Sequence, residues 1–309
     1  MNQIEIMDVC PRDGWQNLKE WIAPEKKLEY IRGLLHCGIR SVQMGSFVSP
    51  KAIPQMASSG ELARKLTVEY PDVFWDALVP NLKGAELASA AGIRHVSYVM
   101  SVSESHNQAN IGRTHQQSLD GLKAIRDAFP DLDVSLALAT SFGCPFEGET
   151  PFERVEEYVE YGVQLGLTRV ELSDTIGSAA PQQVIRAFGT LSKRYPQIRF
   201  IAHMHDTRNN GVLNGWLAAE HGASVIHTAL GGLGGCPFAP GASGNTSTED
   251  LVYLLERSGV RTGVDCSKII DLAKQMRAQI EGVYSGHQIS ILDDCYEKAC
   301  QTRFERKAE

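Results

Sequence analysis

Two histidines that follow a short apolar run have the spacing of metal ligands. His203 and His205 end the segment IAHMH at 201–205. Side chains two apart on a strand project to the same side, so both imidazoles can point at one ion. Asp206 follows directly and can orient one of the rings. The alternative is a pair of structural histidines packed under a loop, but a satisfied core histidine does not need a second one beside it.

An arginine and a carboxylate follow the first predicted strand. Arg12 and Asp13 lie in the segment PRDGWQN at 11–17. Such a pair offers a metal a carboxylate ligand next to a cation that can polarise an oxygen. A surface ion pair in a turn is the alternative interpretation.

The longest irregular segment is rich in glycine. It runs from residue 231 to 245, contains six glycines in fifteen residues, and includes Cys236 and Asn245. Glycine removes side-chain restraint, and a loop of this length in a compact domain is usually functional. The alternative is a flexible connecting loop without a function of its own. Cys236 is the only reactive side chain in this loop.

Short β-rich runs alternate with helical patterns along the chain. The predicted strands are 4–9, 41–44, 74–79, 95–100, 134–139, 169–172, 199–203 and 224–229. The predicted helices are 24–37, 60–69, 84–91, 116–129, 151–165, 181–195, 210–221 and 248–258. Eight such units predict an α/β fold, a closed (β/α)₈ TIM barrel. A doubly wound open sheet is the alternative, but no GxGxxG motif follows the first strand.

Two more helical patterns, at 267–279 and 291–304, follow the barrel. We therefore expect one catalytic domain over 1–309, with the barrel at about 3–260 and a C-terminal helical extension at about 261–309. These exposed helices also suggest a homo-oligomer, with a dimer as the first expectation.

Closure of the barrel would bring the polar strand ends together, because strands eight and one become neighbours. Asp13, His203, His205 and Asn245 would then supply a carboxylate, two imidazoles and an amide oxygen. This mixed nitrogen and oxygen set favours Mg²⁺ or Mn²⁺, with Co²⁺ and Zn²⁺ as further candidates. Without thiolate ligands, a structural zinc site is not expected.

The composition limits the classes of partner. The formal net charge is −7, which argues against nucleic acid and against a polybasic membrane patch. No apolar run approaches the roughly 20 residues that span a bilayer, and no signal-peptide pattern is present. Seven scattered cysteines without a CxxC pair are typical of a reduced, cytoplasmic protein.

The chain resembles 3-hydroxy-3-methylglutaryl-CoA lyase and the wider group of metal-dependent barrel lyases and synthases. The matching segments run in family order over nearly the whole chain: PRDGWQN at 11–17, SFVSPKAIPQM at 46–56, PNLKG at 80–84, GCPFEG at 143–148, DTIG at 174–177, HMHDT at 203–207 and the glycine-rich segment with its continuation at 231–256.

The resemblance implies a role for each matching residue. It assigns the metal to Asp13, His203, His205 and Asn245, and enolate stabilisation to Arg12. Asp174 would lie near the substrate hydroxyl, and Cys236 would lie on a mobile loop that closes over the substrate. We also expect contacts with the acyl-CoA, from residues that match the family pattern and from two, Gln43 and Glu171, that depart from it: Gln16, Lys19, Gln43, Ser46, Lys51, Asn81, Lys83 and Glu171.

The resemblance also implies a retro-aldol cleavage of a 3-hydroxyacyl-CoA. The metal would bind the 3-hydroxyl and the terminal carboxylate, and His203 or Asp174 would remove the hydroxyl proton. The C2–C3 bond would break to give a keto acid and a thioester enolate. Arg12 would stabilise the enolate, and Cys236 or another acid would protonate it to acetyl-CoA. With 3-hydroxy-3-methylglutaryl-CoA as substrate, the keto acid would be acetoacetate, as in leucine degradation.

Several positions depart from the family pattern. Gln43 replaces a usual Glu, and Ser135 and Ala137 replace basic and tyrosyl residues. Glu171 adds a carboxylate, and Trp15 adds bulk beside the Arg–Asp pair. These changes are either neutral drift or a changed acyl pocket. In the second case the substrate would be a shorter acid, such as citramalyl-CoA or a methylmalyl-CoA, although Ala137 works the other way by creating space.

Two other functions stay open at this point. A Claisen-type synthase would condense acetyl-CoA with a 2-keto acid, but the cysteine-bearing glycine loop favours a lyase. A non-catalytic barrel would not need Arg12, Asp13, His203, His205 and Asn245 together.

Overall fold

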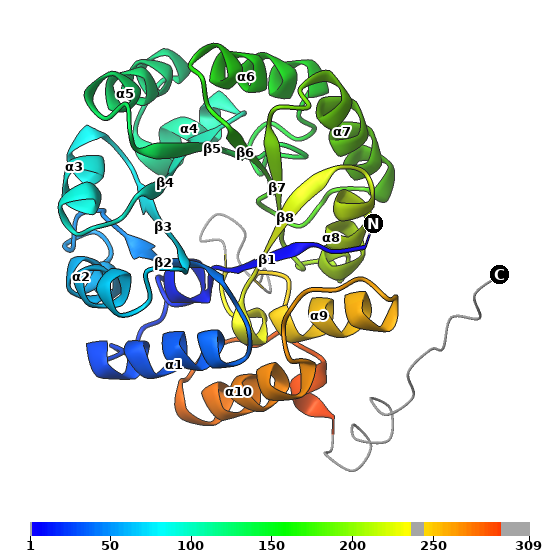
Figure 1. The fold of residues 1–309 in the computed structure, drawn as a ribbon. Helices are drawn as coiled ribbons and strands as arrows, with labels where there is room; N and C mark the ends of the chain where they lie inside the picture. The colour runs from blue at the N-terminus through cyan, green and yellow to red at the C-terminus, as the bar shows by residue number, and fades with distance from the viewer. Residues whose placement is uncertain (1, 236–243, 292–309) are drawn as a thin grey trace.

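Eight parallel strands form a closed barrel in the computed structural model, which describes residues 2–235 and 244–291. The strands follow one another around the barrel in chain order (Figure 1). Their bounds are β1 Glu5–Asp8, β2 Ser41–Ser46, β3 Phe74–Val79, β4 His95–Ser101, β5 Asp133–Ala139, β6 Arg169–Asp174, β7 Arg199–Met204 and β8 Ala223–Thr228. The predicted (β/α)₈ barrel is confirmed.

Helices form a ring outside the strands (Figure 1). Their bounds are α1 Pro24–His36, α2 Ser59–Glu69, α3 Leu82–Ala90, α4 Glu104–Ile111, α5 His115–Ala128, α6 Phe152–Gln164, α7 Pro181–Arg194, α8 Gly211–Glu220, α9 Thr248–Arg257 and α10 Cys266–Gln279. Pro24 and Pro181 occupy the first helical turn, where a missing N–H is tolerated. Pro151 was predicted inside the first turn of its helix, but it is the N-cap of α6, one residue before the helix begins.

Helix α4 was not predicted from the sequence. It follows β4, and Ser103 caps its first turn by accepting a hydrogen bond from the His106 N–H. The helix ends at Gly112, which adopts a left-handed φ of 67°. Its polar sequence, ESHNQANI, lacks an apolar stripe, so hydrophobic periodicity does not reveal it.

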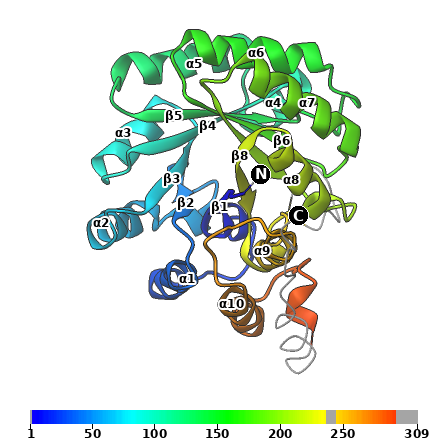
Figure 2. The same ribbon diagram turned by 45° about the vertical axis from the view of Figure 1, so that its right-hand side comes forward.

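The chain after the barrel packs beside the first helix. Helix α10 contacts α1 and α9, and Figure 2 shows these three helices together below the barrel. The predicted helix at 267–279 is therefore present as α10. Of the predicted helix at 291–304, only Ile291 belongs to the described residues. The part of the C-terminal extension after Ile291 therefore stays a prediction.

Strand register decides which residues share a level on the barrel's inner wall. Val99 pairs with Ala137, Ala137 with Glu171, and Glu171 with Ile201. Such rows fill the interior of a (β/α)₈ barrel, while the carboxyl ends of its strands carry the functional groups. Within the described residues, no helix is long and apolar enough to cross a bilayer.

Candidate active site

A cavity of about 480 Å³ opens among the carboxyl ends of the strands and the loops that follow them. Its wall combines residues from all sides of the barrel. The lining includes Arg12, Asp13, Gln16, Gln43, Leu78, Asn81, Ser97, Val99, Arg113, Ala137, Ala139, Glu171, Ser173, His203, His205 and Gly235. Most of the sequence-predicted residues therefore meet in one place.

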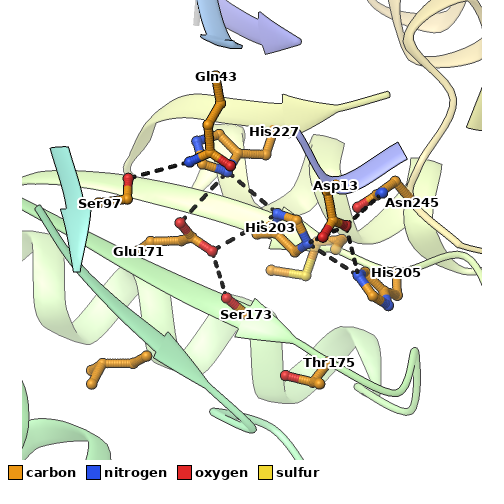
Figure 3. Close-up of polar contacts among 12 residues, drawn as sticks. Asp13, Gln43, Ser97, Glu171, Ser173, Thr175, His203, His205, His227 and Asn245 are labelled. Atoms are coloured by element: carbon orange, nitrogen blue, oxygen red, sulfur yellow. Dashed lines mark hydrogen bonds and ion pairs between the residues drawn. The ribbon is translucent and has the colours of Figure 1, made fainter. Parts of the chain in front are cut away.

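The three strongest metal candidates converge at one side of this cavity. The Nε2 atoms of His203 and His205 face each other at 3.0 Å, and each lies 4.0 Å from Asp13 Oδ2 (Figure 3). His203 belongs to β7 and His205 follows its end, so the strand period directs both rings inward. Asp13 lies in a single π-helical turn, Cys10–Gly14, a conformation often found at functional sites.

Charge and burial keep Asp13 and His203 in forms that can bind a metal ion. Burial alone would raise the pKa of Asp13, but Arg12, His203 and His205 together with Asn245 lower it to about 2. Burial lowers the pKa of His203 to about 3. At neutral pH the carboxylate is therefore ionised, and the His203 imidazole is neutral with one free lone pair.

The spacing of the donors fits a divalent ion. Two metal–nitrogen bonds of about 2.1 Å at a right angle place their nitrogens about 3 Å apart, which matches His203 and His205. The Asp13 oxygen lies farther away and would have to move inward by about 1 Å. His205 Nδ1 is buried and has no hydrogen-bond partner among the described residues.

Asn245 reaches the cluster through a short pairing of segments. A β-bridge joins it to His205, and the Thr246 N–H donates to the Met204 carbonyl at 3.2 Å. The Asn245 side-chain N–H donates to Asp13 Oδ2 at 2.8 Å and to the Leu233 carbonyl at 3.1 Å. Asn245 thus orients Asp13 here, and its role as an oxygen ligand stays a prediction.

Arg12 is held from two sides. Its guanidinium donates to the Gln43 side-chain oxygen and to Asp13. The Gln43 amide in turn donates to Asp76 Oδ2 at 2.6 Å. Burial raises the pKa of Asp76 to about 6 despite the hydrogen bonds from Gln43 and Ser97. Asp76 is therefore part of this chain of contacts, and the sequence analysis did not single it out.

A second polar group lies beneath His203. Glu171 accepts a hydrogen bond from Ser173 Oγ at 2.6 Å, and its two oxygens lie 3.8 Å from His203 Nδ1 and 3.6 Å from His227 Nδ1. Figure 3 shows His203 between this group and Asp13. The sequence analysis did not single out His227. Because His227 and Val225 are two residues apart on β8, their side chains share a face, and this spacing could have placed His227 on the inner face of the barrel.

Asp174 lies apart from the cavity wall. Its two oxygens accept hydrogen bonds from the N–H groups of Ser178 and Ala179, at 2.9 and 3.0 Å. Burial raises its pKa. The side chain thus stabilises the turn that leads into α7.

The predicted acyl-CoA contacts divide into two groups. Gln16, Gln43, Asn81 and Glu171 line the cavity. Asn81 also caps α3 by accepting from the Gly84 N–H at 2.9 Å. Lys19, Lys51 and Lys83 are exposed and Ser46 is buried, and none of these four lines the cavity.

Trp15, which the sequence analysis singled out, lies elsewhere than in the cavity wall. Trp15 is 1% exposed and lies in the hydrophobic core, so it does not narrow the cavity as its bulk suggested. Cys236 lies outside the described residues, which end on this side at Gly235, a residue of the cavity wall.

Comparison with known proteins agrees with this arrangement. The HMGL-like family model matches residues 3–276. This chain belongs to the HMGL-like family. Lyases of this family depend on a divalent metal ion and break carbon–carbon bonds, which agrees with the convergent ligands described above.

Individual members of the HMGL-like family are similar over most of their length. The (R)-citramalyl-CoA lyase of Chloroflexus aurantiacus is 40% identical over 291 residues, covering 91% of this chain and 92% of that protein. A hydroxymethylglutaryl-CoA lyase of Bacillus subtilis is 39% identical over 274 residues, covering 88% and 91%. The structure of an HMG-CoA lyase from Acinetobacter baumannii, in complex with coenzyme A and 3-methylmalate, superposes with a TM-score of 0.88 at 37% identity over 93% and 94% of the two chains.

Proposed function

We propose that this protein is a divalent-metal-dependent lyase that cleaves the C2–C3 bond of a short 3-hydroxyacyl-CoA. The products are acetyl-CoA and a keto acid. The observation that carries the proposal is the convergence of Asp13, His203 and His205 beside Arg12 at one side of a 480 Å³ cavity. This arrangement places a cation site next to the fixed positive charge of Arg12, in a cavity that a thioester can enter.

Asp13, His203 and His205 would hold the metal ion, and Asn245 would complete the set. When bound, the ion supplies Lewis-acid polarisation of the substrate's hydroxyl and carboxylate oxygens. Nitrogen and oxygen donors without thiolate favour Mg²⁺ or Mn²⁺ over a structural zinc.

Arg12 is the residue best placed to stabilise the thioester enolate. Arg12 is 9% exposed, and Gln43 and Asp13 fix its guanidinium before substrate binds. A donor held in place needs no reorganisation when negative charge develops on the enolate oxygen.

Glu171 is better placed than Asp174 to accept the proton of the 3-hydroxyl. Glu171 lines the cavity beside His203, whereas both oxygens of Asp174 are occupied by backbone N–H groups. The hydroxyl oxygen then forms the new carbonyl, and the electrons of the C2–C3 bond pass to C2. An acid, for which Cys236 is the candidate, returns a proton to C2.

Two substrates are candidates. 3-Hydroxy-3-methylglutaryl-CoA is the first, because several close relatives act on it. Citramalyl-CoA is the second. The buried carboxylate of Glu171 favours it, because the carboxylate of a longer acid would come close to Glu171, and two buried carboxylates side by side are unfavourable. A methylmalyl-CoA would satisfy the same condition.

The decisive experiment is an assay of acyl-CoA release over these thioesters, which detects acetyl-CoA from the first two and propionyl-CoA from a methylmalyl-CoA, whose methyl group lies on C2. The enzyme is first treated with a chelator and then supplied with Mg²⁺ or Mn²⁺. We expect metal-dependent release from at least one thioester. Metal-independent release, or consumption of acetyl-CoA together with a keto acid, would contradict the proposal, and the second result would indicate a synthase.

The assembly and cellular location stay predictions from the sequence. We propose a homodimer, which light scattering on the purified protein can test, and a cytoplasmic location.

A further inference from the structure

A small second cavity, which we call the floor cavity, lies at the end of the barrel opposite to the catalytic cavity. The first residues of four strands line it: Phe74 of β3, His95 of β4, Asp133 of β5 and Arg169 of β6. The next inward positions of three of these strands are polar: Asp76, Ser97 and Ser135. Branched apolar side chains usually fill such positions in a (β/α)₈ barrel. The floor cavity has a volume of about 10 Å³, roughly the least space that holds one water molecule.

His227 separates the floor cavity from the proposed metal ligands. It lines the floor cavity, and its Nδ1 atom lies 3.3 Å from His203 Nδ1 (Figure 3). The Nε2 atom of His203 faces His205, so a neutral His203 that binds metal through Nε2 must carry its ring proton on Nδ1. Glu171 Oε1 lies 3.8 Å from His203 Nδ1, which is too far for a hydrogen bond. His227 Nδ1 is therefore the acceptor of this proton.

The contact with His203 decides where His227 carries its own proton. Two N–H groups cannot face each other at 3.3 Å, so His227 Nδ1 must present its lone pair to His203. The proton of His227 then lies on Nε2, on the other edge of the ring. This Nε2 atom is buried and has no hydrogen-bond partner within residues 2–235 and 244–291. The tautomer that suits His203 thus leaves a buried N–H that needs an acceptor.

Arg169 brings a second buried donor to the floor cavity. Its Nε donates to Asp133 Oδ2 at 3.0 Å, and its guanidinium lies 4.3 Å from the centre of the Phe74 ring. Its Nη1 atom is buried and likewise has no partner in the described part of the chain. Two residues that line one small cavity therefore each carry an unpaired N–H group.

The charges around the floor cavity favour a neutral acceptor. The positive charge of Arg169 is already balanced by Asp133. An anion would lie beside the carboxyl groups of Asp76 and Asp133, and a cation would lie beside Arg169. A water molecule can accept from both donors, and the oxygens of Asp76, Ser97 and Ser135 can accept its two hydrogens.

We propose that the floor cavity binds one water molecule, which accepts hydrogen bonds from His227 Nε2 and Arg169 Nη1. The bound water fixes His227 in the tautomer that accepts from His203, and so keeps His203 Nε2 available to the metal ion. His227 and Arg169 are positioning residues, because they act through His203. This inference rests on the proposed metal site. It adds a support for that site at the amino end of the barrel, an end that ordinarily contributes to stability.

A crystal structure of the protein with Mg²⁺ tests the floor cavity directly. We expect an ordered water about 3 Å from both His227 Nε2 and Arg169 Nη1. Crystals grown with bromide distinguish a water from a halide ion, because bromide gives an anomalous signal. A dry floor cavity, or a bromide ion in it, would overturn the inference.

Nitrogen-15 NMR of the Mg²⁺-loaded protein with labelled histidine measures the tautomer independently. Protonated and unprotonated ring nitrogens differ in chemical shift, and the signals that disappear in His227→Gln are those of His227. We expect His227 to carry its proton on Nε2. A proton on Nδ1 would overturn the inference even if the water is present.

Two substitutions of Ser135 separate the effect of the water from that of the neighbouring hydroxyl. Ser135 Oγ contacts Ser97 Oγ at 3.0 Å, and both variants lose this contact. Ser135→Val also fills the floor cavity and excludes the water, and we expect the affinity for Mn²⁺ to fall by about 10-fold or more. Ser135→Ala is the matched control, which leaves room for the water and should keep the affinity of the wild type. Titration calorimetry on chelator-treated protein measures both affinities, and thermal unfolding checks the fold.

The outcomes separate the inference from the proposed function. Equal losses of affinity in the two Ser135 variants would assign the effect to the hydroxyl and overturn the inference. Full affinity in Ser135→Val, with no water in its crystal structure, would also overturn it. If Ser135→Val does not fold, the crystal structure and the NMR spectrum of the wild type decide. Failure of the wild type to bind any divalent ion would contradict the proposed function, and the crystal structure would still decide whether the floor cavity holds its water.

Discussion

Gln43 accepts a hydrogen bond from Arg12 through its side-chain oxygen and donates one to Asp76 through its nitrogen. A neutral amide can act in both directions, whereas a carboxylate at position 43 could only accept. Gln43 therefore joins the enolate-stabilising candidate to a buried carboxylate without adding a charge.

The first prediction concerns this contact. Gln43→Glu places two buried carboxyl groups in hydrogen-bonding contact, and we expect the free energy of unfolding at pH 7 to fall by about 2 kcal/mol. Combining it with Asp76→Asn restores a donor and should recover most of the loss. Urea unfolding of the two single variants and the double variant measures the coupling. Additive effects would contradict the contact.

The second prediction concerns the metal. Asp13→Asn removes the ionised ligand, and we expect the affinity for Mn²⁺ to fall by more than about 100-fold, beyond what loss of an outer contact costs. Titration calorimetry on the chelator-treated protein gives the affinity, and circular dichroism checks the fold. Asp72→Asn, at an exposed position, is the matched control. Unchanged Mn²⁺ binding by Asp13→Asn would exclude the site.

The third prediction concerns Arg12. Arg12→Lys keeps the positive charge but loses the planar group that contacts Gln43 and Asp13 together. We expect kcat to fall by about 10²- to 10³-fold, as for loss of an oxyanion donor, while KM changes by less than about threefold. Steady-state kinetics at saturating Mn²⁺ separates the two parameters. A loss confined to KM would assign Arg12 to thioester binding.

The fourth prediction concerns Glu249, which is fully buried at the base of the glycine-rich segment. Its Oε2 accepts from the Gly231 N–H at 3.0 Å, while its Oε1 has no hydrogen-bond partner within residues 2–235 and 244–291. Burial raises its pKa from 4.5 to about 8. The folded state then binds the proton more tightly than the unfolded state between these values, so this group lowers stability as pH rises from about 4.5 to 8.

Glu249→Gln removes that dependence. We expect the variant to gain stability relative to the wild type by up to about 1.4 kcal/mol per pH unit across this window, and to keep a constant difference above it. Chemical unfolding at a series of pH values measures the difference, with Glu61→Gln on the surface as control. A difference that does not vary with pH would mean that Glu249 titrates normally.

The fold and the metal candidates could be predicted because both follow from periodic patterns. Strands of β-rich residues ending in polar groups indicate a barrel with its site at the carboxyl ends, and His203 and His205 satisfy the strand period. Asp174 was expected near the substrate hydroxyl because the family resemblance implied it. Its hydrogen bonds to two following N–H groups depend on the exact turn, which strand patterns do not specify.

Contacts between distant strands could not be predicted from local patterns. Glu171 and His227 lie on β6 and β8, and only the register of the closed barrel brings them together beside His203. Trp15 follows the π-helical turn, and this turn directs its ring into the core. Sequence alone gives the size of such a residue but not its direction.

The pairing of β1 with β8 also bears on how the protein is made. Asp13 leaves the ribosome almost two hundred residues before His203 and His205 do. The three side chains can meet only after the last strand has docked against the first, a contact of very high sequence separation and therefore a slow one. If these three residues hold the ion, as proposed, a nascent chain can bind it only after the barrel has closed, so the time of metal uptake during synthesis would measure barrel closure.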